Sequence, residues 1–362
     1  MTNRNRTLRI LLAALALLAV LALPAFAEGE KGEANITPQT TMKELRENPS
    51  IKGSGLYTYV YVWERDCGFL QNSKDNDTLQ QVIGKQSVNS CVAGMNLIIE
   101  TYNAGTQITY KLFTPEEIAQ DASRDRAELY YFPAEQPGAK YAVVLSGNAL
   151  FYSGEMRGGV STAWELHQQG YAVFALRYRI GLDATDNAPL EDLGRAIQFI
   201  TANAQQFGVQ TEDYALVGYS SGGQIAGIFG GKELGYPNYG VPKPGALLLA
   251  YPINNFYETK PLYHVLLDTD ALERRYYDYN ISDCVDADYP PTYFWYGQDD
   301  ILLIAFNYWQ QGPALHKALE TYGVPYKESV YRHAPHGVGI GEGTDAEGWV
   351  QEAIAFWEEQ CA

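Results

Sequence analysis

Positively charged side chains are scarce in this chain. It has 26 Lys and Arg residues against 43 Asp and Glu residues, which gives a formal net charge of −17. Three of the arginines, Arg4, Arg6 and Arg9, lie in a segment that we expect to be removed, so the mature chain is more acidic still. A surface of this sign repels nucleic-acid backbones and anionic headgroups. The composition therefore predicts a soluble protein without nucleic-acid or anionic-membrane partners.

Long apolar runs are also rare, because the chain has one, from Ile10 to Leu23. It is shorter than the roughly 20 residues that span a bilayer comfortably. The three arginines precede it and Pro24-Ala25-Phe26-Ala27 follows it, a pattern typical of a signal peptide. We expect residues 1–27 to be cleaved off after Ala27, which leaves a secreted, extracellular or periplasmic protein; the alternative is an uncleaved anchor. No cysteine follows the run, which argues against a lipid anchor.

Cysteine is limited to four residues: Cys67, Cys91, Cys284 and Cys361. An exported chain with four cysteines is compatible with two disulfides in one of three pairings. Proximity in the sequence favours Cys67–Cys91, which leaves Cys284–Cys361. Free buried thiols are an equal alternative, because a chain of this size does not need covalent staples.

The sequence divides into a short polar start, an extension and one large domain. Residues 28–40 are polar and predict a disordered leader. Residues 41–106 show short helical pieces and the aromatic run 56–63, which we interpret as an N-terminal cap rather than an independent domain. Residues 107–362 alternate short apolar runs with amphipathic segments. A tyrosine-rich stretch at 253–289 interrupts this rhythm and predicts a lid-like insertion.

The alternation in residues 107–362 predicts an α/β fold with a mostly parallel twisted sheet of about eight strands and helices on both faces. The connections between the first runs are short, so that end of the sheet is expected to be antiparallel. We expect strands at 108–113, 129–132, 141–145, 171–176, 214–217, 246–250, 292–296 and 326–331. We expect helices at 160–169, 189–206, 222–231, 304–322 and 345–358.

One motif predicts a catalytic nucleophile. Gly218-Tyr219-Ser220-Ser221-Gly222 follows the apolar run 214–217 and opens a predicted helix. In a G-x-S-x-G strand-to-helix turn, the central serine is raised above the sheet and glycines avoid clashes with the crowded backbone. The alternative is a serine in an ordinary glycine-rich turn.

A serine hydroxyl needs a base and an acid that orients it. The five histidines are His167, His264, His316, His333 and His336. Three of them lie in predicted helices or the insertion, whereas His333 and His336 follow the last predicted strand. His336 is favoured as the base because Gly337 permits a tight turn.

The acid is expected after the preceding strand, where Asp299 and Asp300 stand side by side. We favour Asp300, which is three residues past Gly297; the alternative is that either aspartate caps the following helix. The chain order Ser220, Asp300, His336 is typical of this strand-turn-helix nucleophile.

An oxyanion hole needs two N–H donors. We expect Ser221 to supply one, and Asn148 or Ala149, after the run 141–145, to supply the other; the choice between those two stays open. No cofactor or metal site is indicated, because the two clustered histidines have no third ligand in view.

The chain resembles the esterase/lipase branch of the alpha/beta-hydrolase superfamily, and in particular bacterial acetyl esterases and acetyl-xylan-esterase-like proteins. The resemblance rests on 218–223, on 290–300, on His336-Gly337-Val338-Gly339-Ile340-Gly341 and on Ala346-Glu347-Gly348-Trp349. It covers about residues 107–360, and the loop after 141–145 departs from it because Gly147 is the one glycine there. The resemblance implies a cofactor-free serine hydrolase acting on short acyl esters, often acetyl groups on plant polysaccharide.

The leading hypothesis is therefore a secreted serine esterase acting on a small-molecule or carbohydrate ester. A peptidase on the same fold is one alternative, although no propeller domain or amine-binding acids are visible. A non-catalytic carbohydrate- or protein-binding module is the other, prompted by the tyrosine-rich insertion and the altered loop after 141–145. The oligomeric state is not readable from the sequence.

Overall fold

The computed structural model describes residues 30–60, 73–147, 154–184, 186–256 and 280–362. Several expectations lie outside these residues: the signal peptide, most of the insertion at 253–289, the oxyanion candidates Asn148 and Ala149, and Cys67. Within the described part, no helix has both the length and the apolar character needed to cross a membrane.

Eight strands form one sheet in the order β1-β2-β4-β3-β5-β6-β7-β8. The pairs β1–β2 and β2–β4 are antiparallel and the other pairs are parallel. The strands are β1 Thr109–Lys111, β2 Glu128–Phe132, β3 Tyr141–Leu145, β4 Ala172–Arg177, β5 Ala215–Tyr219, β6 Ala246–Ala250, β7 Thr292–Gly297 and β8 Tyr326–Tyr331. The predicted fold class is confirmed, and so is the antiparallel end.

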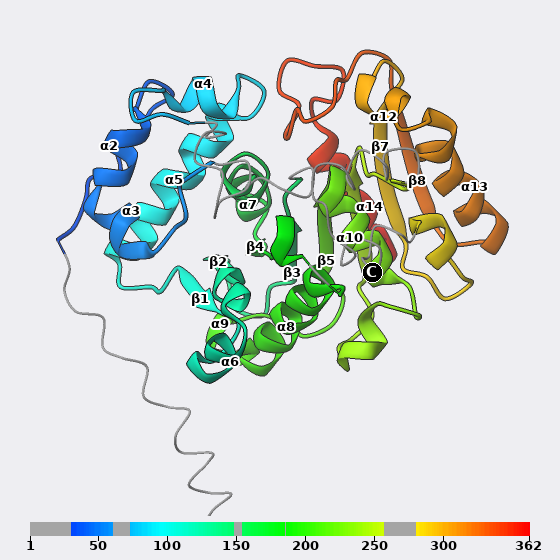
Figure 1. The fold of residues 1–362 in the computed structure, drawn as a ribbon, viewed down its shortest axis with the longest axis horizontal. Helices are drawn as coiled ribbons and strands as arrows, with labels where there is room; N and C mark the ends of the chain where they lie inside the picture. Colours follow the sequence, from blue (N-terminus) through cyan, green and yellow to red (C-terminus); the bar gives the residue numbers. More distant parts are fainter. Residues whose placement is uncertain (1–29, 61–72, 148–153, 185, 257–279) are drawn as a thin grey trace, which may run out of the picture.

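Helices cover both faces of the sheet (Figure 1). On one face lie α6 Pro115–Gln120, α8 Ala188–Ala202, α9 Ala204–Phe207, α10 Ser220–Gly230, α12 Ile301–Ala305 and α13 Gly312–Tyr322. On the other lie α2 Met42–Glu47, α3 Pro49–Ser54, α4 Leu79–Ile83, α5 Val88–Asn103, α7 Ser161–His167 and α14 Trp349–Gln360. Strands β3, β5, β6 and β7 are wholly buried, because both of their faces are covered.

The helix expected at 304–322 is three shorter pieces in the structure. Helix α12 ends at Ala305, a 3-10 turn covers Tyr308–Gln310, and α13 begins at Gly312. Asn307 adopts a left-handed backbone with φ of 62°, which interrupts the helix. Pro313 lies in the first turn of α13, where its missing N–H costs nothing.

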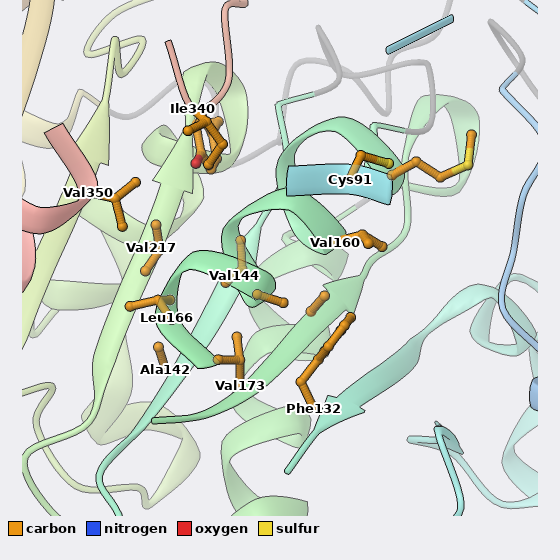
Figure 2. Packing of buried hydrophobic residues seen from close by; sticks show 14 of the residues in the cluster. Cys91, Phe132, Ala142, Val144, Val160, Leu166, Val173, Val217, Ile340 and Val350 are labelled. Carbon is orange, nitrogen blue, oxygen red and sulfur yellow. The ribbon is translucent and has the colours of Figure 1, made fainter. Parts of the chain in front are cut away.

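The N-terminal extension shares a core with the sheet. Figure 2 shows Cys91 of α5 in one buried cluster with Val160, with Val144 of β3 and with Val173 of β4. Gly94 permits the close approach of α5 to residue 160, since an added Cβ would lie 2.8 Å from the Val160 carbonyl oxygen. The extension is therefore packed against the large domain rather than separate from it.

Residues 30–40 were expected to belong to a disordered leader, and this prediction is wrong. Ile36 is buried. Its backbone N–H donates to Asn96 Oδ1 at 2.9 Å, and Asn96 Nδ2 donates back to its carbonyl at 3.1 Å. The buried Ile36 side chain and the two hydrogen bonds between its backbone and the Asn96 amide hold this polar segment on α5.

The favoured disulfide pairing is also wrong. Cys91, Cys284 and Cys361 are free thiols, so neither Cys67–Cys91 nor Cys284–Cys361 is formed. Cys91 is fully buried in the core formed by the extension and the sheet. The three described cysteines are free thiols, as in the alternative, with Cys91 buried and Cys284 and Cys361 partly buried.

Candidate active site

The turn between β5 and α10 raises Ser220 above the sheet. Ser220 has a φ of 51°, in the left-handed region, and is 9% exposed. A Cβ on Gly218 would lie 2.6 Å from the Cα of Gly223, and one on Gly222 would lie 2.4 Å from the Leu145 carbonyl oxygen. The glycines of the motif are thus required by close backbone contacts, as expected for this turn.

His336 reaches Ser220 from the loop after β8. Its Nε2 lies 2.8 Å from Ser220 Oγ. The imidazole packs against the ring of Tyr251, with 4.7 Å between the ring centroids. Gly337 has a φ of 78°, which supplies the tight turn expected after the histidine.

Asp300 completes the chain of hydrogen bonds. Its Oδ2 lies 2.8 Å from His336 Nδ1, and its side chain is 1% exposed. Its Oδ1 accepts from the backbone N–H groups of Leu302 and Leu303 at 2.9 and 3.1 Å, at the start of α12. In the sequence analysis, capping of the following helix was the alternative to a contact between Asp300 and the histidine. The residue does both, and the capping bonds fix the orientation of its carboxylate.

The competing candidates, Asp299 and His333, pair with each other instead. His333 Nδ1 lies 2.7 Å from Asp299 Oδ2, and both side chains are more than half exposed. The backbone N–H of His333 donates to Asp345 Oδ2 at 2.9 Å. This second pair runs beside the first and does not line the cavity at Ser220.

Ser220 and His336 open onto a cavity of about 230 Å³. One wall is apolar and consists of Ile253, Phe256, Leu302 and Phe306. Gly147, Gly154, Gly158 and Arg157 also line the cavity, and Tyr251 lies beside the histidine. The arginine is held by a 2.8 Å bond from Nη2 to the Val82 carbonyl of the extension.

Sequence reasoning missed Tyr251 and Arg157 as site residues. Tyr251 directly follows β6, and the ends of parallel strands are where sites form, so its position was a usable signal. Its φ of 38° turns it out of the strand. Arg157 lies in a π-helical turn, Glu155–Val160, a local irregularity that a periodic pattern does not reveal.

The extension also contacts the loop that carries His336. Ser87 Oγ donates to the Val338 carbonyl and accepts from the Ile340 N–H, both at 3.0 Å. The Gly339 N–H donates to the Tyr251 hydroxyl at 3.0 Å. These bonds hold the segment just after the histidine, and nothing in the sequence of the extension indicated them.

The first expected oxyanion donor, Ser221, is buried in the first turn of α10. The N-terminal end of a helix carries a partial positive charge that favours a nearby anion. The second donor, Asn148 or Ala149, lies outside the described residues, so this part of the site stays a prediction. Among the described residues, no group of three or more His, Cys, Asp or Glu side chains could hold a metal ion.

A family model and one relative each match part of this chain. The BD-FAE family model matches residues 128–234, a stretch that includes Ser220 but neither Asp300 nor His336. The chain is similar to endo-1,4-beta-xylanase B of Butyrivibrio fibrisolvens, with 22% identity over 224 residues, 59% of this chain and 33% of that protein. The match thus spans about a third of the relative's length.

Solved structures match over a larger part of the chain. The acetyl ester-xyloside bifunctional hydrolase of Caldicellulosiruptor lactoaceticus has a TM-score of 0.58 at 19% identity, covering 69% of this chain and 95% of its own. An inhibited esterase B of Lactobacillus rhamnosis has a TM-score of 0.56 at 18% identity, and the match covers 70% of this chain and 86% of the esterase. The carboxylesterase Cest-2923 of Lactobacillus plantarum has a TM-score of 0.55 at 17% identity, and the match covers 65% of this chain and 93% of the carboxylesterase. The chain has the alpha/beta-hydrolase fold.

Within this fold, the antiparallel end of the sheet and the parallel strands after it agree with the expectation from the short first connections and the apolar runs. At this level of identity the likeness shows the fold.

Proposed function

We propose that this protein is an exported serine carboxylic ester hydrolase that removes short acyl groups, acetyl above all, from a carbohydrate. The observation that carries the proposal is the hydrogen-bonded chain from Ser220 Oγ through both ring nitrogens of His336 to Asp300, beside a small cavity. A hydroxyl, a base and a buried acid in this order are the requirements for an acyl-enzyme mechanism.

In the first half of the proposed reaction, Ser220 Oγ attacks the acyl carbonyl carbon while His336 Nε2 takes its proton. Asp300 stays ionised, fixes the Nδ1–H tautomer and stabilises the imidazolium. The C–O bond to the alcohol then breaks, and His336 gives its proton to the departing oxygen. The product of this half is an ester of Ser220.

In the second half, water attacks the acyl-serine and His336 again takes a proton. Collapse of the tetrahedral intermediate releases the carboxylic acid and returns the proton to Ser220. We assign the Ser221 N–H and one N–H from Asn148 or Ala149 to the negative oxygen in both halves. Such donors act on charge that develops in the transition state, where removal of one costs about 10²–10³ in rate.

The dimensions of the cavity support a short acyl group. At about 230 Å³ it is smaller than the roughly 300–1,000 Å³ of ordinary small-molecule sites. The side chains of its apolar wall offer no hydrogen-bond partner to a polar acyl chain. Two of them, Phe256 and Phe306, have their ring centroids 5.6 Å apart. A carbohydrate as the alcohol part is supported by two similar proteins, one named as a xylanase and the other as an acetyl ester-xyloside hydrolase.

The test is turnover of p-nitrophenyl acetate and p-nitrophenyl butyrate by the chain from residue 28. We expect acetate to be the better substrate, and Ser220→Ala to lose about 10⁴-fold or more in kcat, because the three residues act as a unit. A fluorophosphonate should label the parent chain and leave Ser220→Ala unlabelled. Equal turnover by parent and variant would refute the assignment of the nucleophile.

Export is proposed on the N-terminal sequence pattern alone. We expect the protein recovered outside the cytoplasm to begin at Glu28. Sequencing of its N-terminus measures this directly, and a protein that begins at Met1 would contradict it.

A further inference from the structure

Tyr251, the residue after β6, has a strained backbone that is held from two sides. Its φ of 38° lies in the left-handed region, which is unfavourable for a bulky side chain. Its N–H donates to the Trp295 carbonyl of β7 at 2.6 Å, and two residues later the Ile253 N–H donates to the Ser220 carbonyl at 3.1 Å. Strain of this kind persists where the surroundings impose it, and it is concentrated at functional sites.

The Tyr251 side chain contacts the histidine loop at two points. Its ring lies against the imidazole of His336, with 4.7 Å between the centroids and 58° between the planes. Its hydroxyl accepts from the buried N–H of Gly339 at 3.0 Å. The ring also packs edge-on against Trp295 at 4.9 Å and against Tyr219 at 5.8 Å. The tyrosine is therefore a rigid support, because neighbouring rings fix its own position.

The hydrogen bond to Asp300 does not by itself fix the imidazole plane. A single bond between His336 Nδ1 and the carboxylate holds one point of the ring, about which the ring can still tilt. Tilting moves Nε2 away from Ser220 Oγ, which now lies 2.8 Å from it. A displacement of about 1 Å between reacting groups can cost about 10²-fold in rate. A firm contact on the side of the imidazole, such as the ring of Tyr251, limits this tilt.

We propose that Tyr251 is a positioning residue for the base: its ring limits the tilt of His336 and its hydroxyl holds the loop at Gly339. This inference rests on the proposed esterase function and adds a residue to its machinery. Because the segment from Tyr251 to Ile253 is also bonded to the carbonyl of the nucleophile, it fixes base and nucleophile relative to each other. The role acts through the histidine, so its loss should lower kcat.

The test uses Tyr251→Leu, which removes the ring and the hydroxyl, and Tyr251→Phe, which removes the hydroxyl alone. Matched controls are Tyr293→Leu and Tyr293→Phe. Tyr293 is a fully buried tyrosine of β7 that donates to Glu352 Oε2 at 3.3 Å and does not line the cavity at Ser220. Thermal melting gives the stability of all four variants, and kcat on p-nitrophenyl acetate is measured on folded protein.

We expect Tyr251→Leu to lose about ten- to hundredfold in kcat, because the imidazole can tilt. Tyr251→Phe should recover part of this loss and stay about three- to tenfold below the parent, because the ring is kept and one hydrogen bond is lost. KM should change less than kcat in both variants, and the Tyr293 controls should keep the kcat of the parent. Parent-like kcat in Tyr251→Leu, or a loss through KM alone, would overturn the positioning role.

A spectroscopic readout tests the same role without ester turnover. The Nδ1–H proton of His336, bonded to Asp300, is observed by proton NMR and assigned by its absence in His336→Gln. Exchange with water requires this bond to open, so a held ring gives a persistent signal. We expect the signal to broaden or disappear in Tyr251→Leu and to persist in Tyr293→Leu. A signal as persistent in Tyr251→Leu as in the parent would overturn the proposal.

The two measurements separate this proposal from the esterase function. If the parent chain neither hydrolyses the ester nor reacts with a fluorophosphonate, the esterase function fails, and the NMR signal still decides whether Tyr251 holds the imidazole. If Tyr251→Leu does not fold, Tyr251→Phe decides instead. A kcat equal to that of the parent in Tyr251→Phe would then overturn the proposal, and the expected three- to tenfold loss, absent from Tyr293→Phe, would support it.

Discussion

Two aspartate–histidine pairs stand side by side above the sheet, and single residues distinguish them. Asp300 and His336 are largely buried and connect to Ser220, whereas Asp299 and His333 are exposed and connect to each other. Asp300 is also held by two N–H groups of α12. Burial and this additional fixation make the first pair suited to orient a base for chemistry.

A matched pair of variants tests this distinction. We expect His336→Ala to lose about 10⁴-fold or more in kcat on p-nitrophenyl acetate, because the base for Ser220 is removed. His333→Ala should stay within a fewfold of the parent chain, because its pair lies at the surface. Steady-state kinetics on the two purified variants give the answer. A larger loss in His333→Ala than in His336→Ala would reverse the assignment.

Among the elements, α5 carries more of the site than its position in the sequence indicates. Ser87, the residue before α5, does not cap the helix with its side chain. Its hydroxyl bonds the loop after His336 instead, and Asn89 Nδ2 donates to Glu342 at 2.7 Å near the end of the same loop. The extension thus fixes the loop that positions the imidazole.

Ser87→Ala is expected to reduce kcat severalfold while KM for p-nitrophenyl acetate changes little. The variant leaves the buried Ile340 N–H without its acceptor, which costs about 1–3 kcal/mol of stability and loosens the histidine loop. Ser90→Ala is the control on the same helix, since its hydroxyl bonds Glu165 of α7 at 2.6 Å rather than the loop. Equal kcat values in the two variants would show that the contact has no positioning role.

The sequence predicted the elements with strong local signals and missed those that depend on packing. Each of the eight strands was expected within a few residues. The signal is strongest for β3, β5, β6 and β7, because a parallel strand buried on both faces is a largely apolar run. Helix α5 was missed, although Val88, Cys91, Met95 and Ile98 have helical spacing. The bond from Ser87 to the histidine loop joins residues 251 positions apart, and no local pattern encodes such a contact.

At the scale of the whole molecule, the core is stabilised without the expected disulfides. Burial raises the pKa of the Cys91 thiol to about 12, and burial raises that of Cys284 to about 12 as well. A thiol reacts as its thiolate, so in the folded protein both should be nearly inert at ordinary pH.

We therefore expect a reducing agent to leave the Tm unchanged. A thiol reagent at pH 8 should modify Cys91 and Cys284 slowly in the native protein and quickly after denaturation. Mass spectrometry after timed alkylation measures both rates at each cysteine. A fall in Tm of several degrees on reduction would contradict this prediction, because a lost disulfide in a folded chain costs about 2–5 kcal/mol.

The hydrogen bonds between Ser87, at the start of α5, and the loop after His336 also limit how far this protein can be truncated from its N-terminus. The family model begins at residue 128, and a recombinant fragment starting near residue 107 would retain Ser220, Asp300 and His336. It would also uncover the apolar surface that Met95 and Ile98 now occupy and would release the loop from Ser87. Trimming to the region shared with relatives would therefore yield an aggregation-prone polypeptide with a misaligned base, so expression and directed evolution should retain residues 30–106.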